Sequence, residues 1–125
     1  MGKYVSRITH QGREILLLSI PNSNEAQRLE AWAEAKEVLL QQKGACLALV
    51  DVRNITLAPG SLDKAKEAAA AARKDPGNRI AFVGLTRLQA STALIALRTM
   101  HVRAHFCDTL DEGKAWLVRE AEKRD

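Results

Sequence analysis

Apolar and polar residues along the chain follow two alternating patterns, one typical of strands and one typical of helices. Short apolar runs end at polar turns or at Gly and Pro, and each is followed by a longer segment whose apolar residues recur every three or four positions. The predicted strands are residues 4–8, 13–20, 46–50, 80–84 and 102–107, and the predicted helices are residues 25–42, 62–74, 87–99 and 110–123.

Two of the predicted strands, residues 46–50 and 80–84, are apolar at nearly every position. Such continuous runs are typical of strands buried on both faces, as in parallel sheets. Successive strands are separated by enough residues for a helical crossover. The pattern therefore predicts one α/β domain over residues 1–125, in the order ββαβαβαβα. It predicts a mixed sheet of about five strands with parallel central strands.

Three helices begin at residue pairs that are typical of N-terminal capping boxes. The pairs are Asn24 with Gln27, Thr86 with Gln89, and Thr109 with Glu112.

The composition is that of an ordinary globular domain, and it argues against a membrane-spanning segment and a nucleic-acid partner. The hydrophobic fraction is 46% and the charged fraction 27%, and no apolar run approaches the roughly 20 residues that span a bilayer. With no apolar stretch at the N-terminus, we expect a cytoplasmic protein without an integral membrane segment. The net charge is +4, but basic residues alternate with acidic ones and only 4% of residues are aromatic. We therefore expect no nucleic-acid partner.

Chemistry-bearing residues occur without the spacing of a known catalytic or metal site. His101, His105 and Cys107 are close in sequence, yet no paired Cys or His motif accompanies them, so we predict no metal site. Asp51 and Asp108 each follow a strand, where ligands of α/β proteins often bind, but Asp is also a common loop and capping residue. We predict no catalytic residue and no cofactor.

The segments 47–52 and 80–85, and the C-terminal segment 106–117, together resemble a known family. The last of these runs from Phe106 through Thr109 and Glu112 to Trp116 and Leu117. It is similar to SpoIIAA-like proteins of the STAS class, whose fold is shared by anti-sigma-factor antagonists and related to CRAL-TRIO lipid-transfer domains. The resemblance covers about residues 12–120. It implies four helices mainly on one face of the sheet and a binding role without enzymatic activity.

Ser61 is a candidate phospho-acceptor through this resemblance. In the antagonist branch, a serine at the start of the second helix is phosphorylated within an Asp-Ser-Ser-Gly motif. Residues 57–63 of this chain lack that motif, and only Ser61 could match. The simpler interpretation is that Ser61 is an N-cap, whose hydroxyl accepts a backbone N–H.

The predicted helix 87–99 is apolar around most of its circumference. A helix of this kind is buried against more than its own sheet, either within the monomer or against a partner. The candidate interface residues are Leu88, Leu94, Ile95 and Leu97.

Two classes of function follow from these observations. The first is a non-enzymatic interaction or regulatory module, with a protein partner or a dimer formed through helix 87–99. The alternative is a small-molecule or lipid-binding domain, which requires an apolar cavity.

Overall fold

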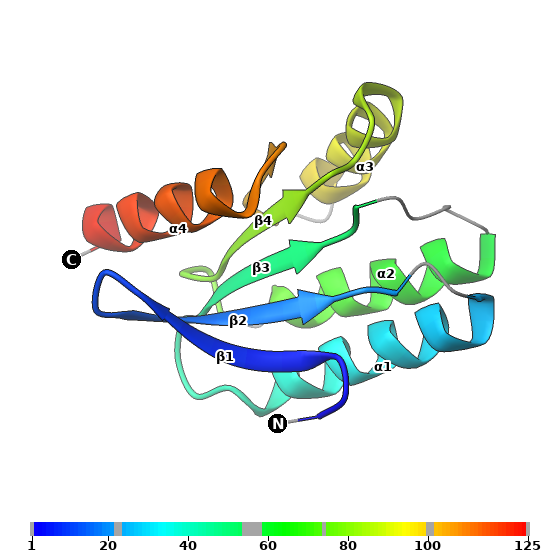
Figure 1. The fold of residues 1–125 in the computed structure, drawn as a ribbon, viewed down its shortest axis with the longest axis horizontal. Helices are drawn as coiled ribbons and strands as arrows, with labels where there is room; N and C mark the ends of the chain where they lie inside the picture. Colours follow the sequence, from blue (N-terminus) through cyan, green and yellow to red (C-terminus); the bar gives the residue numbers. More distant parts are fainter. Residues whose placement is uncertain (1, 22–23, 54–58, 74, 100–101, 125) are drawn as a thin grey trace.

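The computed structural model describes residues 2–21, 24–53, 59–73, 75–99 and 102–124. Within these residues the elements follow the predicted order ββαβαβαβα (Figure 1). They are β1 (Val5–His10), β2 (Arg13–Ser19), α1 (Glu25–Gln41), β3 (Leu47–Asp51), α2 (Pro59–Ala72), β4 (Arg79–Val83), α3 (Arg87–Thr99), β5 (Ala104–Cys107) and α4 (Leu110–Arg124).

The strands form a mixed sheet in the order β1-β2-β3-β4-β5. β1 and β2 are antiparallel, and β2, β3, β4 and β5 are parallel to one another. The β1–β2 hairpin turns through Gln11 and Gly12, both with positive φ, which is the two-residue geometry that matches strand twist. β3 and β4 occupy the centre of the sheet, as their continuous apolar runs predict.

Helices α1 and α2 pack together on one face of the sheet, and α4 packs on the other (Figure 1). Alternate residues of one strand point to opposite faces. Ala48 and Val50 accordingly belong to the hydrophobic cluster under α1 and α2, whereas Leu47 and Leu49 belong to the cluster under α4.

The connection through α3 crosses the sheet in the same direction as the connections through α1 and α2. Right-handed crossovers in sequential order place their helices on the same face. Leu85 and Val102, which flank α3, pack against the cluster under α1 and α2. Helices α1 and α2 thus cover one face of the sheet and α4 covers the other, while α3 contacts the edge strand β5.

The predicted capping residues close the helices as expected. The Asn24 Oδ1 accepts from the Gln27 N–H at 2.8 Å, and the Thr109 Oγ1 accepts from the Glu112 N–H at 3.1 Å. No helix among the described residues is long and apolar enough to span a bilayer.

The largest difference from the predicted boundaries lies at the start of α2, and it concerns Ser61. Helix α2 begins at Pro59, three residues before the predicted start, because proline fits the first turn of a helix, where its missing N–H costs nothing. Ser61 is therefore the third residue of α2 and not its N-cap. Its side chain lies outside the part that the structure describes.

Candidate functional site

Helix α3 begins at a reciprocal capping box. The Thr86 Oγ1 accepts from the Gln89 N–H at 3.2 Å, and the Gln89 Oε1 accepts from the Thr86 N–H at 3.0 Å. These two bonds satisfy backbone donors that the first turn of a helix leaves without a partner. The start of α3 is therefore set directly after the carboxyl end of β4.

The four candidate interface residues of α3 divide into a buried and an exposed side. Leu97 is 5% exposed and belongs to the protein core, and Leu94 is half-buried. Leu88 and Ile95 are 79% and 70% exposed. The structure thus removes Leu97 from the predicted interface, because docking beside β5 buries that side of the helix. It leaves Leu88 and Ile95 on the surface.

Leu88 and Ile95 lie on one face of the helix, because seven residues make almost two turns, or roughly 10 Å along the axis. Between them, Ser91 and Thr92 are exposed, and the Thr92 hydroxyl donates back to the Leu88 carbonyl at 3.1 Å. We call the side chains of Leu88, Ser91, Thr92 and Ile95 the α3 face. Its centre presents small side chains without charge between two large aliphatic ones.

Positive charge flanks the α3 face at both ends. Arg87 stands at the start of α3 and Arg98 in its last turn, and both are exposed. The sequence of this helix contains no Asp or Glu. The two arginines therefore have no acidic partner on their own helix.

The carboxylates of Asp51, at the end of β3, and Asp108, directly after β5, do not form an acid–base pair. β4 lies between β3 and β5, so Asp51 and Asp108 are separated by the width of a strand. Arg53 binds Asp51 through two side-chain bonds of 2.9 Å and 2.8 Å. Gly84, whose φ is +95°, follows β4 against Arg53, and a Cβ there would lie 2.7 Å from the Arg53 Cα. Close packing explains this glycine.

His105 and Cys107 lie on one face of β5, because they are two residues apart in a strand, but each contacts a different neighbour. The His105 ring stacks on the Trp116 ring, with centroids 5.0 Å apart. The Cys107 thiol donates to the Phe82 carbonyl at 3.4 Å, and its burial raises the pKa to about 11. His101 lies outside the described residues. In the described part of the chain, no three His, Cys, Asp or Glu residues could hold a metal ion together.

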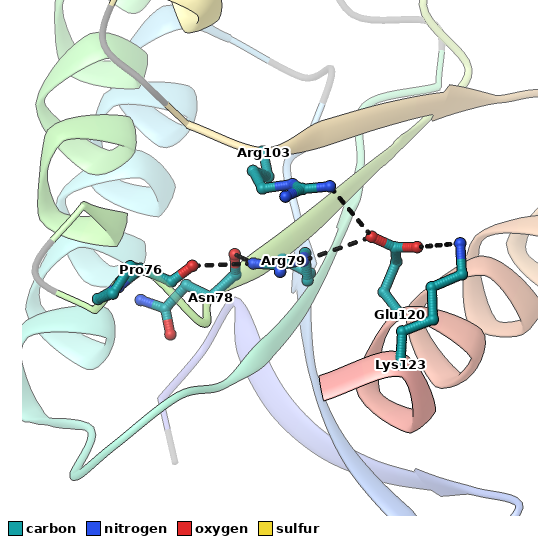
Figure 2. Close-up of polar contacts among 6 residues, drawn as sticks. All are labelled: Pro76, Asn78, Arg79, Arg103, Glu120 and Lys123. Atoms are coloured by element: carbon teal, nitrogen blue, oxygen red, sulfur yellow. Dashed lines mark hydrogen bonds and ion pairs between the residues drawn. The ribbon is translucent and has the colours of Figure 1, made fainter. Parts of the chain in front are cut away.

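Sequence reasoning missed a buried ion pair between β4 and α4 (Figure 2). The Arg79 Nε lies 3.4 Å from the Glu120 Oε1, and only 10% and 9% of the two side chains are exposed. The Arg79 Nη1 also donates to the carbonyls of Pro76 and Asn78, at 2.9 Å each. Glu120 comes three residues after Leu117, a helical spacing that places both on the sheet-facing side of α4.

Glu120 also forms ion pairs with two cations nearer the surface, and one of them, Lys123, donates a hydrogen bond to it. Lys123 lies 3.1 Å from its Oε2 and Arg103 lies 3.8 Å from its Oε1 (Figure 2). The hydrogen bond from Lys123 is the main cause that lowers the pKa of Glu120, and Arg103 and Arg79 add to it. Because its carboxylate oxygens are used in these contacts, we interpret the cluster as an anchor for α4.

Comparison with known proteins supports the fold and leaves the function open. Neither a protein-family model nor a curated protein matches the sequence. Among solved structures, the chain is similar to an anti-sigma-factor antagonist (STAS) domain protein from Planctomyces limnophilus. The TM-score is 0.64 at 8% sequence identity, over 91% of this chain and 97% of that chain. The chain therefore has the STAS fold, which confirms the resemblance inferred from its sequence.

Proposed function

We propose that this chain is a non-enzymatic interaction module that binds a partner protein through the α3 face. The observation that carries the proposal is the exposure of Leu88 and Ile95, at 79% and 70%, on one side of a capped helix. Burying a large aliphatic side chain contributes about 1.5–3 kcal/mol. Two such residues at the centre of an interface are enough to act as its anchors.

The charge around the α3 face identifies the chemistry of the partner. Arg87 and Arg98 flank the apolar residues, and the helix contains no acidic residue. A complementary surface has an apolar centre with Asp or Glu at its rim. Two copies of α3 packed symmetrically would bring arginines together, in parallel or antiparallel orientation. We therefore favour a different protein with an acidic rim over the dimer that the sequence alone suggested.

A role without catalysis is supported by the side chains that could take part in a reaction, because each of them already contacts another part of the protein. Asp51 is bound by Arg53, His105 stacks on Trp116, and the pKa of the Cys107 thiol is raised. The solved structure with the same fold is described as an anti-sigma-factor antagonist, a name for a protein that counteracts another protein. Phosphorylation of Ser61 stays a prediction of the resemblance.

The test begins with a photo-crosslinking amino acid at Ser91, which lies between the two exposed aliphatic residues. Crosslinking in living cells followed by mass spectrometry identifies the bound protein, which is then purified. Its affinity is measured by calorimetry for the wild type and for Ile95→Asp. Leu40→Asp is the matched control, because Leu40 is a large aliphatic residue that is 50% exposed on α1.

We expect Ile95→Asp to weaken binding at least tenfold and Leu40→Asp to leave it unchanged. Arg87→Glu with Arg98→Glu weakens binding as well, more at low salt than at high salt. Equal losses in Ile95→Asp and Leu40→Asp would contradict the proposal. Light scattering tests whether a second copy of this chain binds the α3 face instead. If the wild type is a dimer and Ile95→Asp is a monomer, the partner is a second copy of this chain.

A further inference from the structure

Strand β5 presents an open edge. It is the last strand in the order of the sheet, so β4 pairs with only one of its two sides. The Arg103 carbonyl, directly before the strand, accepts from the Ile80 N–H of β4 at 3.1 Å. The backbone groups of alternate residues point to opposite sides of a strand. The N–H and C=O groups of Ala104 and Phe106 therefore point away from the sheet.

Among the residues that the structure describes, no hydrogen bond uses these outward groups. Helix α3 contacts β5, but the backbone bond between the two segments runs from the Val102 N–H to the Leu97 carbonyl, before the strand begins. The open groups alternate along β5 with the spacing of a strand edge, so the segment that matches them is another extended strand.

The outward residues of β5 are complementary to a second copy of the same strand in antiparallel orientation. With a two-fold axis at His105, Ala104 of each copy lies opposite Phe106 of the other, and each such pair exchanges two hydrogen bonds. The side chains of Ala104 and Phe106 are half-buried on one face of the strand, where the Phe106 ring stacks on Phe82. A large side chain thus lies opposite a small one on both sides of the axis.

The charges along β5 are complementary in the same orientation. Arg103 and Lys123, both exposed, lie near the start of the strand, where they pair with the buried Glu120 (Figure 2). Asp108 and Glu112, both exposed, lie at the end of the strand, where α4 begins. The antiparallel orientation places the basic start of one strand beside the acidic end of the other, which favours this register.

The opposite edge of the sheet is less suited to such pairing. The Ser19 N–H of β2 donates to the Tyr4 carbonyl, so the even-numbered residues of β1 point toward β2. The outward residues of β1 are Val5, Arg7 and Thr9. The register that pairs all three with a second copy places Arg7 directly opposite Arg7, and like charges in that position are destabilising.

We propose that this chain forms a symmetric dimer through β5, in which the two sheets join across an antiparallel β5–β5 pair. Ala104 and Phe106 form the backbone bonds, and Arg103 of each copy contacts the acidic residues at the end of the other copy's β5. A strand this short makes a small interface, so the dimer is concentration-dependent. The interface lies on β5 and not on the α3 face, so it is separate from the function proposed above.

Ala104→Pro tests the backbone pairing. Proline is tolerated in an edge strand where the N–H points outward, so the fold stays intact while the intermolecular bonds donated by this N–H are lost. Thr9→Pro is the matched control, because the Thr9 N–H points outward from the other edge strand. Sedimentation over a concentration range should show that Ala104→Pro weakens the dimer by roughly tenfold or more. Thr9→Pro should dimerise like the wild type, and circular dichroism verifies that both variants are folded.

Charge reversal tests the orientation of the two strands. Arg103→Glu and Glu112→Arg should each weaken the dimer, because like charges then meet across the two-fold axis. An equimolar mixture of the two variants should restore it, because each contact between the copies again joins opposite charges. A mixture that stays monomeric would overturn the antiparallel arrangement.

Three results would overturn the β5 dimer itself. They are a wild type that stays monomeric at high micromolar concentration, Ala104→Pro that dimerises like the wild type, and equal losses in Ala104→Pro and Thr9→Pro. Ile95→Asp should dimerise like the wild type, because Ile95 is outside this interface. Loss of the dimer in Ile95→Asp would assign it to the α3 face instead. Binding of a different protein to the α3 face is measured separately, so the two proposals fail independently.

Discussion

Replacing Gly113 by alanine tests how closely α4 packs on the sheet. Gly113 lies in the first turns of α4, and a Cβ at this position would lie 2.5 Å from the Leu49 Cδ1 and 3.2 Å from the Cys107 Sγ. Carbon atoms in contact are ordinarily about 3.5–4.0 Å apart. Leu49 is fully buried in β3, at the centre of the sheet, so it has little room to move.

Two opposing effects determine the magnitude. Alanine is favoured over glycine in a helix by about 1 kcal/mol. Overpacking a closed core costs about 1–3 kcal/mol, and the overlap of more than 1 Å with Leu49 favours the upper part of that range. We therefore expect Gly113→Ala to lower the free energy of unfolding by about 1–2 kcal/mol.

Urea denaturation followed by circular dichroism measures this change, and Ala115→Gly at an exposed position of the same helix calibrates helix propensity. A double-mutant cycle with Leu49→Val should show that Gly113→Ala costs less once the Cδ1 atom is removed, by about 0.5–1 kcal/mol. If Gly113→Ala instead raised the free energy of unfolding by about 1 kcal/mol, the full difference in helix propensity between alanine and glycine, α4 could not pack as closely on the sheet as the structure indicates.

Two further predictions concern buried polar groups. Glu120→Gln should lower the free energy of unfolding by about 2–3 kcal/mol, because it leaves the buried Arg79 guanidinium without its carboxylate partner. The loss is smaller than for a buried charge without any partner, because Arg79 still donates to the carbonyls of Pro76 and Asn78. The pKa of Glu120 is lowered in the folded protein, so its contribution is complete above the unfolded pKa and is lost as pH falls through the folded pKa. Urea denaturation below about pH 4.5 should therefore show a weaker pH dependence in Glu120→Gln than in the wild type. In a Cys46→Ser variant, the remaining Cys107 thiol, whose pKa is about 11, should react slowly with a disulfide reagent until the protein unfolds. A fast reaction in the native state, or a pH profile unchanged by Glu120→Gln, would contradict these accounts.

The fold was predictable because several local signals agree. The continuous apolar runs in β3 and β4 indicated buried parallel strands, and the capping pairs at Asn24, Thr86 and Thr109 located three helix starts. Each signal depends on residues a few positions apart, which the sequence displays directly. The start of α2 was placed too late because Ser61 was favoured as a cap over Pro59 as a first-turn residue.

The candidate site was only partly predictable because its exposure depends on tertiary docking. Helix α3 has apolar residues around most of its circumference, so its sequence does not distinguish the side that packs from the side that is exposed. Packing beside β5 buries Leu97 and leaves Leu88 and Ile95 exposed. The pairing of Arg79 with Glu120 joins residues 41 positions apart, and the helical spacing of Glu120 after Leu117 is the local signal that could have indicated it.

The affinity of the crosslinked partner for wild-type protein and for Ile95→Asp tests the central claim most directly. Ile95 is 70% exposed, so its substitution should leave the folded state intact, as circular dichroism can verify. The account predicts at least a tenfold loss of affinity in Ile95→Asp and none in Leu40→Asp. A partner that binds Ile95→Asp as tightly as the wild type would show that the α3 face is not the binding surface.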